Sequence, residues 1–117
     1  MARSLNARSR YRAVLTEAVA FDRPSGVPDG YGGTTIEWEE AFACHAEFTY
    51  AKGDETVQAA RLAGRSSYKV KINSSSQSRR ITTDWRMRDT RRGQEWNIRE
   101  VDAITDMMWV WLVVEAD

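Results

Sequence analysis

Residues 64–102 read GRSSYKVKINSSSQSRRITTDWRMRDTRRGQEWNIREVD, and three short runs in this stretch alternate apolar residues with polar ones, mostly Lys and Arg. Alternation with a period of two places the apolar side chains on one face of a strand and the charged ones on the other. One buried face and one wet face are typical of an antiparallel sheet. The stretch therefore predicts a small β-meander with a basic outer surface. The apolar members are Tyr68, Val70, Ile72, Trp85, Met87, Trp96 and Ile98.

Length and composition limit the possibilities. A chain of 117 residues with 42% hydrophobic residues is expected to form one folded domain. We predict a basic N-terminal arm over residues 1–12 and a single domain over residues 13–117. Five Trp are many for so short a chain, and Trp is favoured at contacts with partner surfaces. A single Cys excludes an intramolecular disulfide and fits a reducing compartment.

The first half of the chain predicts two strands joined by a loop. The first strand is expected to end near residues 21–23, because the following residues contain both prolines and four of the seven glycines, which predict a loop. Residues 34–50 predict a long strand, since Ile36, Trp38 and Phe42 share one parity with the later apolar residues. Glu40 breaks this parity, which predicts a bulge or bend there. So long a strand in a small domain is expected to curl, as a barrel requires.

The second half predicts one short helix, a loop and a final strand. Residues 53–64 predict the helix, with Asp54 as its N-cap and Gly64 after its end. Residues 73–83 predict a flexible Ser-rich loop whose tip carries Arg79 and Arg80. Residues 107–114, MMWVWLVV, are apolar on both parities and are expected to be buried on both faces. They are too few to span a membrane, so no membrane partner is expected.

Charge is segregated along a chain whose net charge is zero. Residues 1–12 and 61–99 carry net charges of +4 and +8, whereas residues 13–60 and 100–117 carry −7 and −5. Either these charges meet across neighbouring strands and cancel, or they form a bipolar surface that suits head-to-tail stacking or binding of a polyanion.

No arrangement of residues predicts catalysis. Cys44 and His45 are adjacent on one strand and so point to opposite faces, which is a poor geometry for a nucleophile and its base. We expect Cys44 to be a small core residue and His45 a surface residue. Three aspartates (Asp84, Asp89 and Asp102) lack a partnering base, metal-ligating His or nucleophile. The chain is therefore not expected to be an enzyme or to need a metal or cofactor.

Several spaced segments resemble the phage head–tail joining family, the head-closure or stopper proteins and head–tail adaptors of tailed phages and gene transfer agents. The resemblance covers about residues 14–114. The chain departs from the family in its long N-terminal arm and in its Ser-rich loop. The segments that carry the resemblance are Asp29-Gly30-Tyr31-Gly32-Gly33, Ile36-Glu37-Trp38, Gly53-Asp54-Glu55, Ala59-Ala60-Arg61-Leu62-Ala63-Gly64, Ser67-Tyr68-Lys69-Val70-Lys71-Ile72, Ile81-Thr82-Thr83-Asp84-Trp85-Arg86-Met87-Arg88-Asp89 and Trp96-Asn97-Ile98-Arg99-Glu100-Val101-Asp102.

The resemblance implies a mainly β fold, a small antiparallel β-barrel of about six strands with one short helix and long loops. It also implies a virion protein, assembled in the host cytoplasm, that forms a ring of six or twelve copies at the head–tail interface. Its partners would be the portal adaptor, the tail terminator and the double-stranded DNA in the channel. On this basis Arg79 and Arg80 are expected to face the DNA channel. A ring or neighbour interface is expected to contain Arg3, Arg8, Arg10, Arg12, Trp109 and Trp111, and a helix contact to an adjacent ring to contain Val57, Arg61 and Leu62.

An alternative class is a single-stranded nucleic-acid-binding barrel of the oligonucleotide-binding type. Basic strands with Tyr68, Trp85 and Trp96 would then form a stacking platform. These aromatic residues have the parity opposite to the cations, however, and are expected to face the core. Tight, salt-dependent binding of single strands by the monomer would distinguish this class from a ring subunit.

Overall fold

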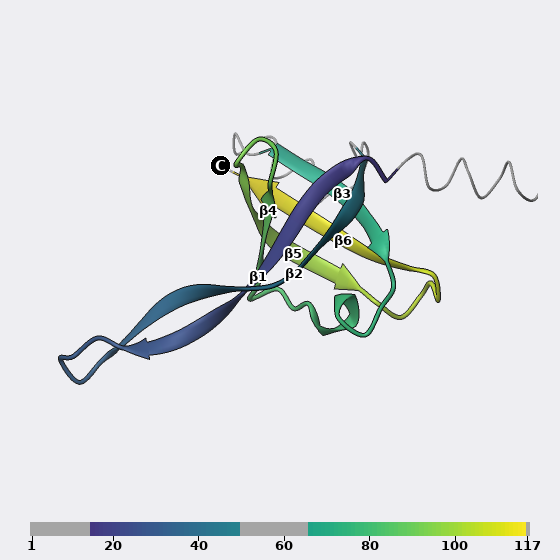
Figure 1. Cartoon of the computed structure of the whole chain (residues 1–117). Helices are drawn as coiled ribbons and strands as arrows, with labels where there is room; N and C mark the ends of the chain where they lie inside the picture. Colours follow the sequence, from purple (N-terminus) through teal and green to yellow (C-terminus); the bar gives the residue numbers. More distant parts are fainter. Residues whose placement is uncertain (1–14, 50–65, 117) are drawn as a thin grey trace, which may run out of the picture.

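The computed structural model describes residues 15–49 and 66–116, which form six strands in a closed barrel (Figure 1). Neighbouring strands follow the order β1-β2-β3-β6-β5-β4, and every pair is antiparallel. The prediction of a mainly β barrel of about six strands is thus confirmed. The strands are β1 (Glu17–Pro28), β2 (Thr34–Thr49), β3 (Ser66–Asn73), β4 (Arg86–Asp89), β5 (Glu95–Asp102) and β6 (Trp109–Ala116).

Helix is nearly absent from this part of the chain. The helical element there is a three-residue 3-10 turn, η1 (Ser78–Arg80). The predicted helix over residues 53–64 and the predicted basic arm over residues 1–12 lie outside the described residues.

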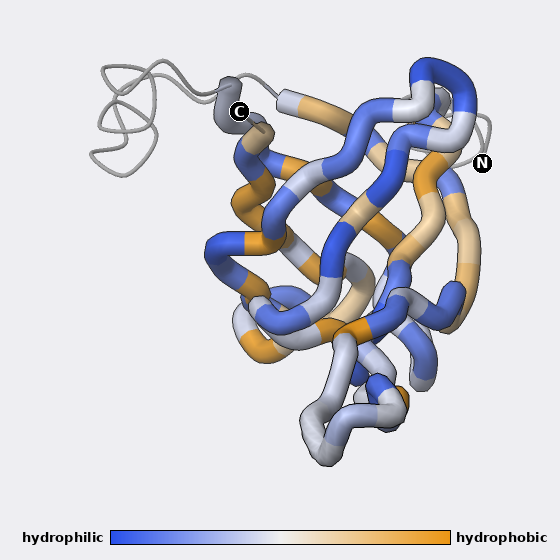
Figure 2. Tube along the Cα trace, turned by 90° about the vertical axis from the view of Figure 1, so that its left-hand side faces the viewer, coloured by the Kyte–Doolittle hydropathy of each residue, from blue (hydrophilic) through white to orange (hydrophobic). Residues whose placement is uncertain are grey.

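The core is formed by the alternate residues of each strand that point into the barrel. Figure 2 shows hydrophilic and hydrophobic residues alternating along the strands. Val70, Ile72 and Met87 are fully buried, and Ile98 is 2% exposed. The strands and buried faces predicted for residues 64–102 are therefore correct, because their apolar members pack in or against the core. The predicted meander is wrong: β3 pairs with β2 and β6, whereas β4 pairs with β1 and β5. Trp96 lies among these residues, with its ring edge-on to Phe48 and Tyr68 at centroid distances of 6.0 and 5.4 Å.

β1 and β2 continue together beyond the barrel as a two-stranded ribbon (Figure 1). Their register changes at the rim of the barrel, where Phe21 pairs with Phe42 but Asp22 pairs with Glu40. Ala41 is thus the additional residue of a β-bulge, and the predicted break in parity at Glu40 is confirmed. Residues 23–40 leave the barrel at this bulge. We call this ribbon the arm; it is distinct from the predicted basic N-terminal arm of residues 1–12.

The end predicted for the first strand is wrong, because β1 continues to Pro28 through residues expected to form a loop. The reason lies in β4, which pairs with β1 only between Val19 and Asp22. Beyond Asp22 one edge of β1 has no neighbour, so residues without an N–H group are tolerated there. Pro24 and Pro28 therefore lie within a paired strand, opposite Trp38 and Thr34.

The prediction for residues 107–114 is correct for the strand and wrong for its start. Met107 and Met108 are 86% and 70% exposed and precede β6. Within β6, Val110 and Leu112 belong to the core, so the inward face is buried as expected. The outer face is buried only in part, because Trp109 and Trp111 are half-buried within the subunit.

Trp96 provides a test of the core. The side chain is 8% exposed, and its Nε1 has no hydrogen-bond partner among the described residues. We expect Trp96→Ala to lower the free energy of unfolding by about 3–5 kcal/mol, because it opens a cavity. Trp96→Phe keeps a ring and removes the unpaired donor, and we expect it to cost less than about 1.5 kcal/mol. Urea unfolding followed by circular dichroism measures both values. Equal costs would contradict this account of the site.

Candidate interaction surfaces

Asp22 is the centre of a charge cluster on the outside of the barrel, at the base of the arm. Its carboxylate accepts hydrogen bonds from Arg86 Nε at 2.7 Å and from Arg88 Nε and Nη2 at 2.7 and 3.0 Å. Arg88 also donates to Glu40 at 2.7 Å, and Arg86 lies 3.3 Å from Glu95. Asp22 is only 2% exposed, so the two arginines replace water around it. The cluster joins β1, β2, β4 and β5.

The ion pairs lower the pKa of Asp22. Burial raises this pKa, but the hydrogen bonds from Arg88 and then Arg86 outweigh burial and hold the pKa below its ordinary value of 3.8.

Trp38 also contacts the cluster. Its ring lies 4.7 Å from the guanidinium carbon of Arg86, a cation–π distance. Trp38 therefore packs the base of the arm against the barrel.

The turn between β4 and β5 is built around a second buried carboxylate. Asp89 is 1% exposed and accepts hydrogen bonds from the backbone amides of Arg91 and Arg92, both at 3.0 Å. Burial opposes ionisation of Asp89, but these amides and the side chain of Arg92 hold its pKa below the ordinary value. Arg92 also donates to Glu17 at 3.0 Å, and Gly93 adopts the positive φ of 75° that the turn requires.

Trp109 and Trp111, predicted at an interface, lie half-buried on the outer face of β6. Lys71 lies between them, with its Nζ 4.6 Å from the Trp109 ring and 5.5 Å from the Trp111 ring. The same Nζ is 3.1 Å from Glu47, and Lys69 Nζ is 6.0 Å from the Trp111 ring. The two tryptophans are therefore partly covered within the subunit by lysines of β3. Their predicted role at an interface stays a prediction.

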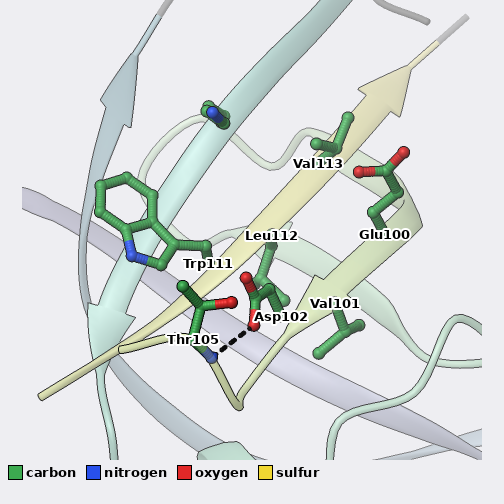
Figure 3. Close-up of a pocket in the computed structure, with 8 residues that line it drawn as sticks. Glu100, Val101, Asp102, Thr105, Trp111, Leu112 and Val113 are labelled. Atoms are coloured by element: carbon green, nitrogen blue, oxygen red, sulfur yellow. Dashed lines mark hydrogen bonds between the residues drawn. The ribbon is translucent and has the colours of Figure 1, made fainter. Parts of the chain in front are cut away.

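A groove adjoins Trp111 over the paired strands β5 and β6 and the loop that joins them, and Figure 3 shows residues of its lining. Asp102 accepts a hydrogen bond from the backbone amide of Thr105 at 3.0 Å, so its carboxylate is turned toward its own loop. Lys69 and Glu100 also line this groove. The charges there are mixed, and they indicate no particular ligand.

These contacts decide between the two interpretations of the segregated charge. Arg86, Arg88 and Arg92 pair with acids from β1 and β2, and Arg99 pairs with Glu115 at 2.6 Å. The cations of the strands are therefore largely neutralised inside the subunit. Arg79, Arg80 and Lys69 form no ion pair with any residue in the described ranges.

The loop that carries Arg79 and Arg80 has a defined conformation, unlike the flexible loop that we predicted. Ser75 and Ser78 hold it together, since Ser78 Oγ accepts from the Ser75 amide at 2.7 Å and Ser75 Oγ accepts from the Ser78 amide at 3.0 Å. Ile81 follows the turn and is buried at 4% exposure, which fixes the loop to the core. Both arginines are exposed. Their predicted position at a DNA channel is not tested by these contacts.

Sequence reasoning did not predict that residues 23–40 project from the barrel as an arm. Its strand β2 alternates Ile36 and Trp38 with Glu37 and Glu39, a signal that was readable in the sequence. What the sequence did not show is that both faces of this ribbon lie outside the barrel. Ile36 is 66% exposed and Trp38 is 42% exposed.

The remaining predicted residues give no sign of a reactive site. Burial raises the pKa of the Cys44 thiol to about 11, and His45 on the opposite face is exposed. Across residues 15–49 and 66–116, His, Cys, Asp and Glu form no group of three that could hold a metal ion. No helix in those same ranges is long and apolar enough to cross a bilayer. The following predicted contact residues lie outside the described part of the chain: Arg3, Arg8, Arg10, Arg12, Val57, Arg61 and Leu62.

A small closed barrel with a projecting arm and internally paired charges is typical of a structural protein that acts through its contacts. The chain belongs to the phage head completion protein family, whose sequence model matches residues 11–117. It is thus a structural component of the virion at the head–tail region, in a family that is typically non-enzymatic. The resemblance to phage head–tail joining proteins is confirmed at this level.

Two solved structures share the fold. A chain from the virion of a native gene transfer agent particle matches with a TM-score of 0.60 and 16% identity, over 86% of this chain and 93% of that one. Protein SF1141 from Shigella flexneri 2a matches with a TM-score of 0.64 and 13% identity, over 86% of this chain and 90% of that one. No curated protein matches the sequence.

The Asp22 cluster predicts a dependence of stability on pH. The folded pKa of Asp22 lies below 3.8, so the carboxylate stabilises the fold at neutral pH, and this contribution is lost as the pH falls below 3.8. We expect Asp22→Asn to cost about 2–3 kcal/mol at pH 7, since it removes the negative charge and one of the two acceptor oxygens that the two arginines share, and places an amide donor beside them. The difference from the wild type should shrink as the pH falls below 3.8 and through the lowered pKa of the folded state.

Asp84→Asn is the matched control. Asp84 is exposed and forms no ion pair with a described residue, so its substitution should change the free energy of unfolding by less than about 0.5 kcal/mol. Urea unfolding of the three proteins at several pH values measures these differences. An Asp22→Asn penalty that does not depend on pH would contradict the role of the charge.

Proposed function

We propose that this chain is the subunit of a head-closure ring, which joins the portal and its adaptor to the tail terminator and lines or closes the channel for double-stranded DNA. Membership of the phage head completion family indicates that the chain acts at the head–tail region. The observation that carries the ring is the arm, because a small barrel has no internal use for a ribbon with two exposed faces. A two-stranded ribbon alone is marginal in water, so a partner surface is expected to cover it.

Pairing of charges inside the subunit supports this function over tight binding of nucleic acid. Strand cations that already contact Asp22, Glu40 and Glu115 are less available to phosphates. A channel through which DNA passes needs only weak, salt-dependent contact, which such a surface is able to provide. The stoichiometry of the ring, six or twelve copies, follows from the rotation between neighbours and belongs to the same proposal.

The contacts do not favour a single-strand-binding barrel. A stacking platform requires exposed aromatic rings. Trp96 is buried at 8% exposure, and Tyr68 and Trp85 pack against the core cluster. The aromatic residues of the basic strands therefore serve packing inside the barrel.

Deletion of the gene tests the proposal. Without this chain we expect heads that fill with DNA but carry no tails, because the ring that receives the tail is missing. Electron microscopy of particles from the deletion strain, with and without the gene supplied in trans, measures the fraction that bear tails. Imaging of wild-type particles with symmetry relaxed at the portal vertex should show a ring of this chain between portal and tail. Absence of the chain from purified particles would overturn the proposal.

A further inference from the structure

The arm has one apolar face and one acidic face. In an antiparallel pair, residues directly opposite each other point to the same side. The register places Pro24 opposite Trp38, and Pro28 opposite Thr34, on the side that also carries Ile36. The other side carries three pairs, Arg23–Glu39, Ser25–Glu37 and Val27–Thr35, and its charged residues are two glutamates and one arginine. Glu37 forms no ion pair with a described residue.

The tip of the arm is held in a defined turn. Asp29 Oδ1 accepts hydrogen bonds from the amides of Tyr31 at 2.7 Å and Gly33 at 3.1 Å. Gly30 and Gly32 supply the positive φ values of 83° and 85° that this turn needs. Tyr31 stands between them and is 95% exposed, so the turn presents an aromatic side chain at the end of the arm.

A second apolar surface lies in the loop between β5 and β6. Ile104, Met107 and Met108 are 92%, 86% and 70% exposed. The loop is ordered by its own acids, since Asp102 accepts from the Ile104 amide at 3.0 Å and Asp106 from the Met108 amide at 2.9 Å. These aspartates are turned toward backbone donors while the apolar side chains face outward.

Arg79 adjoins this apolar loop. Met108 accepts a hydrogen bond from the Ser74 amide at 2.9 Å, and Ser74 Oγ accepts one from Arg79 Nε at 2.9 Å. Arg80 follows in the same turn, and both guanidinium groups lack an acidic partner in the described residues. We call Arg79, Arg80, Ile104, Met107 and Met108 together the Met–Arg surface.

We propose that the arm of one subunit docks on the Met–Arg surface of a second copy of this chain. The apolar face and Tyr31 would cover the methionines. Arg79 and Arg80 would reach past the edge of the ribbon to Glu37 on its other face, whereas Glu39 already pairs with Arg23 at 3.1 Å. This inference rests on the proposed ring and names the contact that closes it. The arm and the Met–Arg surface together hold all six large hydrophobic side chains that are exposed in the described part of the chain.

The two surfaces match in charge and differ in position. Glu39 and Glu40 of the arm already pair with Arg23 and Arg88, and Asp29 holds the turn at its tip. Glu37 is therefore the carboxylate that the arm offers to the two arginines of the Met–Arg surface. Figure 1 shows the arm and the β5–β6 loop leaving opposite sides of the barrel. Association between two different patches is head-to-tail, and it closes into a ring when the rotation between neighbours allows it.

The same geometry changes the expected role of Arg79 and Arg80. A surface that faces DNA is basic and polar, and exposed Met and Ile side chains beside it would contact water and phosphates unfavourably. Beside an apolar, acidic ribbon both parts of the surface find a complement. We therefore assign Arg79 and Arg80 to contact with the arm of a neighbouring subunit instead of contact with DNA.

Disulfide trapping in purified particles tests this contact. We would place Cys at Ile36 and at Met107 of one chain, in a Cys44→Ala background, and oxidise particles produced by a deletion strain that carries this gene. Both positions are exposed, so the fold should be retained, which circular dichroism of the free protein checks. We expect a ladder of covalent multimers of this chain on non-reducing gels, at least tenfold stronger than from the control pair Ile36→Cys with Glu100→Cys.

The possible outcomes separate this inference from the proposed function. A ladder from the first pair and not from the control supports docking between copies. Cross-links to a different virion protein, or no cross-link from particles that contain the chain and bear tails, would overturn the docking while leaving the ring in place. Loss of DNA binding upon Arg79→Gln and Arg80→Gln with no change in cross-linking would also assign the arginines to DNA instead. Absence of the chain from particles would overturn the proposed function itself.

Discussion

The carboxylate of Asp22 binds two arginines at the rim of the barrel, and the shape of the molecule depends on this contact. It connects β1 to β4 inside the closed sheet, and through Arg88 and Glu40 it connects both to β2 just beyond the bulge. Asp22 is the last residue at which β1 has neighbours on both edges. A buried charge without partners would be costly, so the pairing fixes where the barrel ends and in which direction the arm leaves.

The Asp22 cluster also explains why a strongly basic sheet gives an electrostatically balanced barrel. The acids that neutralise Arg86 and Arg88 come from β1 and β2, more than forty residues away along the chain. Such pairs are short and partly buried, and they use the donors of the arginines for internal bonds. Apart from Lys69 on β3, the cations without an ion pair to a described residue are Arg79 and Arg80, which lie on a loop. The proposed contact accordingly uses the arm and the loops, and not the outer face of the strands.

Sequence periodicity predicted the parts of the fold that depend on local pattern. The alternation around Val70, Met87 and Ile98 gave the strands and their buried faces, and the parity break at Glu40 gave the bulge. The extension of β1 through Pro24 and Pro28 could not be read in this way. It depends on β4 being only four residues long, which leaves the edge of β1 free, and this is a fact of tertiary structure.

The candidate site was less predictable than the fold. Apolar composition indicated burial for Met107 and Met108, but the chain leaves the sheet before Trp109 and exposes both side chains. Arg79 and Arg80 were recognised from their charge, and their setting beside Met108 depends on a hydrogen bond between loops that no local pattern encodes. The pairing of Arg86 with Asp22 is likewise invisible without the barrel, because the segment charges alone allow several partners.

The turn at Asp29 has a consequence for how the subunit associates. Its hydrogen bonds and glycines give the tip of the arm a single shape before any partner arrives. A segment that must become ordered on binding loses conformational entropy at each association, and this loss weakens the complex. Here that entropy is lost once, when the chain folds, so each encounter joins two surfaces that are already formed. In the docking proposed above, association would therefore need no refolding step at the contact.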